Sequence, residues 1–187
     1  MCPYPAQVSR ESIVHKAREL IEAEGLDELS LNKLAAALGI RAPSLYKHVA
    51  SKAELLREVN TITSRELVSA MQEAIAAVDT PAAQAQAMAY AYRRFARAYP
   101  ITYGLAYSNL APDQRPDPRE LELLALSLQE TWAAICGPAD ALTALRGAWA
   151  LIHGYVTLEL NDQFQRGGNL DDQFARAVQV YIDGWAR

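Results

Sequence analysis

Residues 30–59 read SLNKLAAALGIRAPSLYKHVASKAELLREV, and this stretch decides the fold of the region around it. Apolar residues at three- and four-residue spacing predict an amphipathic helix over 31–38, and Gly39 supplies its stop. Pro43 suits the first turn of a short helix, expected over 43–49. A helix, a glycine turn and a second short helix form the helix-turn-helix pattern, in which the second helix enters the major groove of DNA.

The helical period separates two faces of the segment 43–49. Leu45 and Val49 point together into the expected three-helix core, and the polar side chains point away from it. The side chains that could meet base edges or phosphates are Ser44, Tyr46, Lys47, His48 and Lys52. Taken singly, Ser44, Lys47 and His48 are ordinary surface residues of a helical hairpin, and Tyr46 could be a core aromatic residue. The combination favours DNA binding, because a short helix with polar residues outside and aliphatic residues inside buries little by itself.

Capping residues and glycine or proline stops divide the rest of the chain into further helices, about nine in all, with no sheet. Ser9 caps the first helix, and capping boxes at Ser51 and Asp117 begin the fourth and the seventh. The expected ranges are 10–24, 31–38, 43–49, 51–78, 81–98, 101–108, 117–135, 139–165 and 171–186. We expect an all-α protein with a helix-turn-helix DNA-binding domain in residues 1–55 and a helical ligand-binding and dimerisation domain in residues 56–187.

Composition limits the class of protein. The formal net charge is −4, yet all four lysines lie in the first 52 residues, so an acidic protein can still carry a local basic face. Two cysteines, Cys2 and Cys136, give neither a disulfide framework nor a metal-binding pair. No apolar run approaches the roughly 18 residues of a membrane span. These features predict a cytoplasmic protein with no membrane contact.

Catalytic signatures are missing from the sequence. The three histidines, His15, His48 and His153, are far apart, and there is no Glu-x-x-His pair, Gly-x-Ser-x-Gly motif or phosphate-binding glycine loop. We therefore expect no enzymatic activity, no cofactor and no metal site. His153 is either a ligand contact or a hydrogen-bonded core residue, since its helix is almost wholly apolar.

Aromatic residues gather in residues 90–107 and recur as tryptophans further on. For any single one, core packing is the simpler interpretation. Together, tyrosines with apolar rings and polar tips suit a mostly apolar pocket with a few hydrogen bonds. The effector-binding residues that we expect are Tyr103, Tyr107, Trp132, Trp149 and His153. Residues 141–160 are apolar on most faces, which predicts burial against both their own domain and a second subunit.

Residues 30–59 resemble the DNA-binding core of the TetR family of regulators. The shared features are Leu38-Gly39-Ile40, the block Leu45-Tyr46-Lys47-His48-Val49, and Lys52, with Val49 where Phe is common. The resemblance implies that DNA is contacted by Ser44, Tyr46, Lys47, His48 and Lys52. It also implies that Arg41 and Ala42, where members of the family vary, set the sequence preference. Trp149-x-x-x-His153-Gly154 is similar to a motif in one subgroup of the family's C-terminal domains.

The resemblance implies a homodimer, built on the last two helices, that binds a near-palindromic double-stranded operator. Its expected function is that of a repressor released from this operator by a small, mostly apolar effector. The alternative is a helical ligand-binding protein that does not act through DNA. Such a protein would have no reason to keep Tyr46, Lys47, His48 and Lys52 together.

Overall fold

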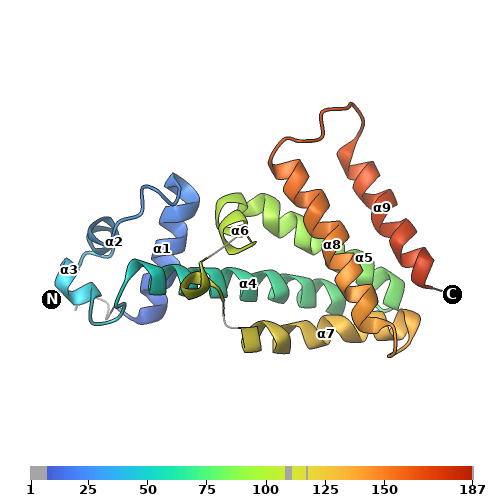
Figure 1. Cartoon of the computed structure of the whole chain (residues 1–187), viewed down its shortest axis with the longest axis horizontal. Coiled ribbons are helices and arrows are strands. Elements are labelled where there is room, and N and C mark those ends of the chain that lie inside the picture. The colour runs from blue at the N-terminus through green and yellow to red at the C-terminus, as the bar shows by residue number, and fades with distance from the viewer. Residues whose placement is uncertain (1–7, 108–110, 117, 187) are drawn as a thin grey trace. The chain divides into compact units, whose positions relative to one another are not determined.

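The computed structural model describes residues 8–107, 111–116 and 118–186. This part of the chain holds nine α-helices, one short 3₁₀ helix and no strand, so the predicted all-α class is confirmed (Figure 1). The helices are α1 (Arg10–Glu24), α2 (Leu31–Ala37), α3 (Ala42–Leu45), α4 (Lys52–Ala76), α5 (Pro81–Ala98), α6 (Pro100–Tyr107), η1 (Pro112–Gln114), α7 (Pro118–Cys136), α8 (Ala141–Leu160) and α9 (Leu170–Trp185). Within these ranges no helix is long and apolar enough to cross a membrane.

Two helices are shorter than the sequence predicts. The helix expected over 43–49 ends at Leu45, because the amides of Lys47 and His48 reach only three residues back, to the carbonyls of Ser44 and Leu45. The helix expected over 139–165 ends at Leu160, because the chain turns through Asp162, whose φ is 53°. The other helix ends lie within two residues of their expected positions.

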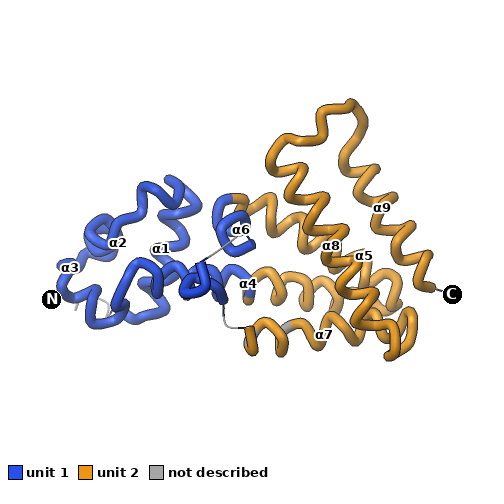
Figure 2. The backbone as a smooth tube through the Cα atoms, viewed as in Figure 1, with its two compact units in different colours: residues 1–64, 101–116 blue, residues 65–100, 117–187 orange. Residues whose placement is uncertain are grey.

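The chain forms two compact units, which Figure 2 shows in blue and orange. The first, called the head unit, comprises residues 1–64 and 101–116, and the second, the body unit, comprises residues 65–100 and 117–187. Helix α4 contributes to both units. Helix α6 belongs to the head unit although it lies between the body helices α5 and α7 in the sequence. A functional boundary near residue 55 stays a prediction.

The head unit has its own apolar core. Side chains from α1 to α4 and the loops between them are almost completely buried there, namely Ile13, Ala17, Ile21, Leu29, Leu34, Leu45, Val49, Leu55 and Val59. Leu105 of α6 packs against this core. Glu22 of α1 accepts hydrogen bonds from the amides of Ile101 (3.1 Å) and Thr102 (2.9 Å), so a carboxylate of α1 caps the N-terminus of α6.

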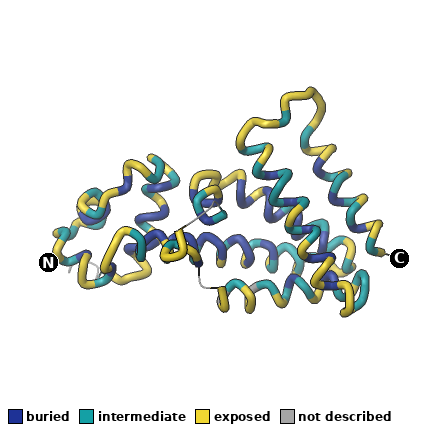
Figure 3. Tube along the Cα trace, viewed as in Figure 1, coloured by how far each residue is buried: buried dark blue, intermediate teal, exposed yellow. Residues whose placement is uncertain are grey.

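The body unit is built on α5, α7, α8 and α9, and α8 packs against the other three. Its largest fully buried side chains include Tyr92, Trp132 and Phe174. Gly147 allows α8 and α9 to approach closely, since a Cβ at that position would overlap the hydroxyl group of Tyr181. Figure 3 shows the buried residues along the packed helices and the mostly exposed connection between α8 and α9.

Candidate DNA interface and effector site

The turn between α2 and α3 has the geometry that the sequence pattern requires. Gly39 adopts a φ of 68°, in the left-handed region that favours glycine. Its amide donates to the carbonyl of Ala36, and the amide of Ile40 donates to the carbonyl of Ala35, both at 3.0 Å. These paired bonds form a Schellman ending, which closes α2 and directs the chain into α3.

Residues 41–48, called the recognition segment below, show the two faces expected from the sequence. Leu45 is completely buried and Val49, just beyond the segment, is 1 % exposed. On the other face, Tyr46 is 54 % exposed, and Arg41 and Lys47 are exposed as well. The remaining candidate DNA contacts of the segment, Ala42, Ser44 and His48, are partly exposed. All six are therefore accessible to a macromolecule.

Positive charge in the head unit is unevenly neutralised. Lys16 pairs with Glu19, and Lys33 pairs with Glu24, whose hydrogen bond raises the pKa of Lys33. Arg41 and Lys47 have no carboxylate partner among the described residues. The recognition segment thus presents two cations that no carboxylate of the described residues neutralises.

Lys52, the predicted phosphate contact at the start of α4, makes an internal bond. Its ammonium group donates to the carbonyl of Leu29 at 2.8 Å, which holds the loop before α2. An ammonium group has three protons, so further donors remain for a phosphate. Ser51 caps α4 as expected, accepting the amide of Glu54 at 3.1 Å.

Three of the five predicted effector residues lie in the body unit, and two of them meet at Tyr92. The ring of Trp149 stands edge-on to that of Tyr92, with centroids 5.2 Å apart. The Tyr92 hydroxyl and His153 Nδ1 are 3.1 Å apart, and burial lowers the pKa of His153. His153 is therefore half-buried on α8 and hydrogen-bonded within the body unit, and its role as a ligand contact stays a prediction.

Trp132, the third of these residues, is 1 % exposed and packs against Tyr181 at a centroid distance of 5.5 Å. It lines a cavity of about 10 Å³, with Ala85, Ala148 and Ile152 among its neighbours. That is about the space of one water molecule. The Trp132 Nε1–H has no acceptor among the described residues. A ligand larger than water could enter this cavity only if side chains moved, and Trp132 Nε1–H would be available to donate a hydrogen bond to it.

The other two predicted effector residues, Tyr103 and Tyr107, lie in α6 and belong to the head unit. Their ring centroids are 5.2 Å apart, and burial raises the pKa of Tyr107 to about 12. That all five residues serve one effector stays a prediction.

Sequence reasoning missed a buried ion pair in the body unit. The Arg93 side chain is 6 % exposed, donates to both carboxylate oxygens of Glu159 at 2.8 and 2.6 Å, and reaches Asp171 at 2.7 Å. Its guanidinium carbon lies 4.8 Å from the centroid of the Phe174 ring. The hydrogen bonds with Glu159 raise the pKa of Arg93. The position of Arg93 in the sequence could have indicated this pair, since Arg93 lies four residues after the buried Ala89, on the apolar face of α5.

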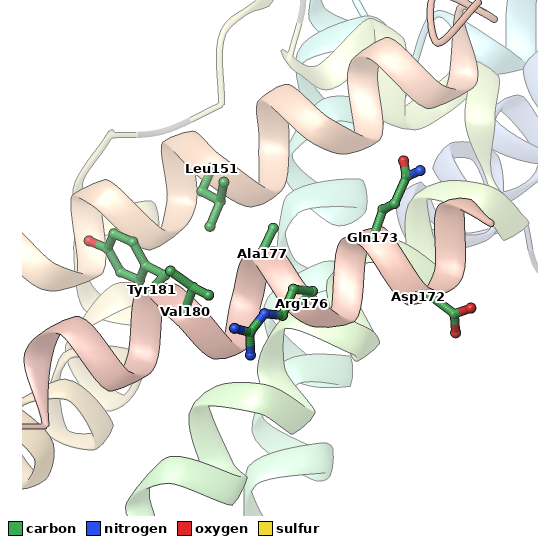
Figure 4. Close-up of a pocket in the computed structure, with 7 residues that line it drawn as sticks. All are labelled: Leu151, Asp172, Gln173, Arg176, Ala177, Val180 and Tyr181. Atoms are coloured by element: carbon green, nitrogen blue, oxygen red, sulfur yellow. The ribbon is translucent and has the colours of Figure 1, made fainter. Parts of the chain in front are cut away.

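An open groove of about 670 Å³ runs between α8 and α9 (Figure 4). Its apolar lining is Leu151 of α8 with Ala177, Val180 and Tyr181 of α9. Three polar residues of α9, Asp172, Gln173 and Arg176, complete it. Elsewhere in the described chain, no cluster of three His, Cys, Asp or Glu side chains could hold a metal ion.

Comparison with known proteins gives two matching family models. One, described as bacterial regulatory proteins of the tetR family, matches residues 13–59 and so includes the whole recognition segment. The other, described as a tetracyclin repressor-like C-terminal domain, matches residues 85–181.

Individual relatives agree with these models. An uncharacterised HTH-type transcriptional regulator of Mycobacterium tuberculosis is 32 % identical over 178 residues, which cover 93 % of this chain and 78 % of that protein. A Rhodococcus sp. RHA1 structure of a protein of unknown function is 25 % identical, with a TM-score of 0.81 and 100 % of both chains covered. A TetR variant of Acinetobacter baumannii, in complex with minocycline, shares the fold at 20 % identity and a TM-score of 0.67, covering 95 % and 96 % of the chains. The chain belongs to the TetR family of DNA-binding transcriptional regulators.

Proposed function

We propose that the protein is a repressor that a small, mostly apolar effector releases from its operator. The observation that carries this proposal is the chemistry of the recognition segment. Tyr46 is 54 % exposed there, and Arg41 and Lys47 find no carboxylate among the described residues. Exposed cations without a carboxylate partner in the described part of the chain suit a polyanion such as duplex DNA.

Two of the proposed contacts supply affinity without sequence information. Lys52 is placed at the N-terminus of α4, where backbone amides also favour phosphate, and Tyr46 offers a hydroxyl at the flank of the segment. Lys52→Ala should weaken binding to all duplexes alike. It should also reduce by about one the slope of the logarithm of the binding constant against the logarithm of the salt concentration. Lys16→Ala is the matched control, since Lys16 pairs with Glu19 on its own helix.

The other proposed contacts supply specificity. Ser44, Lys47 and His48 reach base edges, Arg41 has the fork geometry that pairs with guanine, and Ala42 offers a methyl group to thymine. Arg41→Ala should relax the preference at one base position by about 1–3 kcal/mol. Selection of duplexes from fragmented genomic DNA, followed by mobility shifts on the selected and scrambled duplexes, tests both classes of contact. If Tyr46→Ala, Lys47→Ala and Lys52→Ala together leave binding intact in a folded protein, the assignment is wrong.

We further propose a two-fold homodimer in which a second copy covers the groove between α8 and α9. Val180 lies in the groove with 52 % of its surface exposed, and Leu158 continues the Leu151 face of α8 with 39 % exposed. Gly154 on that face has open space around it, which lets another helix come close. We also propose that the two recognition segments of the dimer bind successive major grooves, roughly 34–36 Å apart, of a near-palindromic operator.

Sedimentation tests this dimer. Leu158→Asp and Val180→Asp should each shift the protein toward monomers, because a carboxylate is costly to bury in a mostly apolar interface. Leu142→Asp is the control, since Leu142 is 41 % exposed and lies on the opposite side of α8 from Leu151. Ile152 and Val156 are unsuitable for this test because they are buried within the body unit itself. An unsubstituted protein that sediments as a monomer at micromolar concentration would defeat the proposal.

The effector site is proposed around Trp132, Trp149 and His153 of the body unit. One part of this proposed site is the small apolar cavity beside Trp132, whose Nε1–H has no acceptor among the described residues. The other part is Tyr92, which contacts both Trp149 and His153. By linkage, an effector that weakens operator binding must bind the DNA-free protein more tightly. A screen of uncharged apolar compounds against the protein bound to a labelled selected duplex should find releasing compounds. Trp149→Phe and His153→Gln should weaken their action, and a screen with no active compound removes the support for this role.

A further inference from the structure

The recognition segment is too short to hold its own conformation. Helix α3 has four residues, and Arg41 at its N-cap makes no side-chain capping bond. A helix of this length is unstable alone, because the cost of nucleation is not recovered by further hydrogen bonds. The exposed Tyr46 and Lys47 follow α3 in a turn. Contacts from elsewhere in the head unit must therefore set the directions of these side chains.

Arg10, the first residue of α1, makes such contacts. Its Nη1 donates to the carbonyl of His48 at 3.1 Å. Its Nη2 donates to Glu54 at 2.6 Å and reaches Glu58 at 3.3 Å. Arg10 thus joins the start of α1, the end of the recognition segment and the first turns of α4. Its own backbone is fixed by the capping box at Ser9 that begins α1.

Glu54 completes the arrangement from α4. One of its carboxylate oxygens binds Arg10, and the other accepts the amide of Ala50 at 2.7 Å. The hydrogen bond from Ala50 lowers the pKa of Glu54 most, and the bond from Arg10 lowers it further. The bond between Arg10 and Glu54 in turn raises the pKa of Arg10. The chain is therefore held on both sides of the buried Val49, by the carbonyl of His48 and by the amide of Ala50.

We propose that Arg10 is a positioning residue for DNA recognition, which fixes the end of the recognition segment and thereby aims Tyr46 and Lys47. This role rests on the proposed function of the segment. The guanidinium group suits it because its rigid fork serves a carbonyl and a carboxylate at once, whereas a lysine ammonium is a point charge without that fork. Arg10 also faces two carboxylates, Glu54 and Glu58, so its charge is already engaged within the protein.

Three variants separate positioning from charge. Arg10→Met removes the donors, Arg10→Lys keeps the charge, and Lys16→Met removes a cation of the same helix that pairs with Glu19. Binding is measured on a duplex that the unsubstituted protein enriches from a random library and on a scrambled duplex, at a temperature where every variant is folded. Arg10→Met should lower affinity for the enriched duplex about tenfold and leave the scrambled duplex within about twofold. Arg10→Lys should recover less than half of this loss. Lys16→Met should leave the ratio of the affinities for the enriched and scrambled duplexes unchanged.

Amide hydrogen exchange of the free protein gives a readout that does not depend on DNA. Arg10→Met and Glu54→Gln should each speed exchange over residues 46–50 about tenfold, with no such change in Lys16→Met. The proposal is overturned if Arg10→Met leaves both this exchange and the affinity ratio unchanged, or if Arg10→Lys restores both fully. If the unsubstituted protein enriches no duplex, the proposed function fails, and the exchange rates alone decide whether Arg10 holds the segment.

Discussion

Replacing Arg93 with Met tests whether the buried ion pair holds the body unit together. Methionine fills much of the same space but donates no hydrogen bond. Glu159, whose side chain is 12 % exposed, would lose two bonds of 2.8 and 2.6 Å and keep its charge where little water reaches it. The substitution therefore leaves an uncompensated charge between α5 and α8.

The expected loss is large for a single substitution. Removing one partner of a buried ion pair costs about 3–5 kcal/mol, because the remaining charge is desolvated without compensation. For a chain of 187 residues this corresponds to a fall in Tm of roughly 6–20 °C. Asp171, also bound to Arg93, is 71 % exposed. Asp171→Asn should accordingly cost only about 0–1 kcal/mol.

Urea unfolding followed by circular dichroism measures these differences, and a double variant supplies the decisive comparison. Arg93→Met with Glu159→Met should recover most of the stability lost in Arg93→Met alone, since two apolar side chains often replace a buried ion pair without cost. The reasoning is refuted if Arg93→Met costs less than about 1 kcal/mol. It is also refuted if the double variant is no more stable than either single variant.

Three further outcomes follow from the structure. Gly147→Ala should cost about 1–3 kcal/mol in urea unfolding, because its methyl group displaces the Tyr181 side chain, whereas Gly104→Ala meets open space and should cost nothing. Burial lowers the pKa of His153, so protonation favours the unfolded chain, and stability should be lost as the pH falls from about 6.5. His153→Gln should therefore reduce the change in the free energy of unfolding between pH 7.5 and pH 5.5. An unchanged dependence on pH would contradict this prediction. Glu22→Ala removes the cap of α6 and should cost about 0.5–2 kcal/mol, with faster amide exchange in the first turn of α6 than in α9.

Local signals in the sequence were sufficient to predict the helices. The caps Ser9 and Ser30 and the stop at Gly39 act through bonds to backbone groups within a few residues, so their effect can be read from the adjacent sequence. The burial of Leu45 and the exposure of Tyr46 likewise follow from the helical period. Gly39, Leu45 and Tyr46 also carry the family resemblance, and the match over residues 13–59 agrees with it.

The length of α3 could not be predicted in this way. Proline and polar residues after Gly39 favour a helix over 43–49, yet the α-helix ends at Leu45. The chain beyond it is held by Arg10 and Glu54, which lie 44 positions apart in the sequence. A bond of this kind depends on how α1 and α4 pack, and no pattern within the segment records it.

The sequence by itself therefore determined the all-α class, the helix-turn-helix and the residues that face outward from it, because these depend on hydrogen bonds and periodicity within single helices. Only the tertiary structure decided which distant groups meet. It joined Arg93 to Glu159 across 66 positions and Glu22 to Thr102 across 80, and it placed α6 in the head unit. A buried charge or an open helix end needs a partner, and the packing of the helices determines which residue comes within reach.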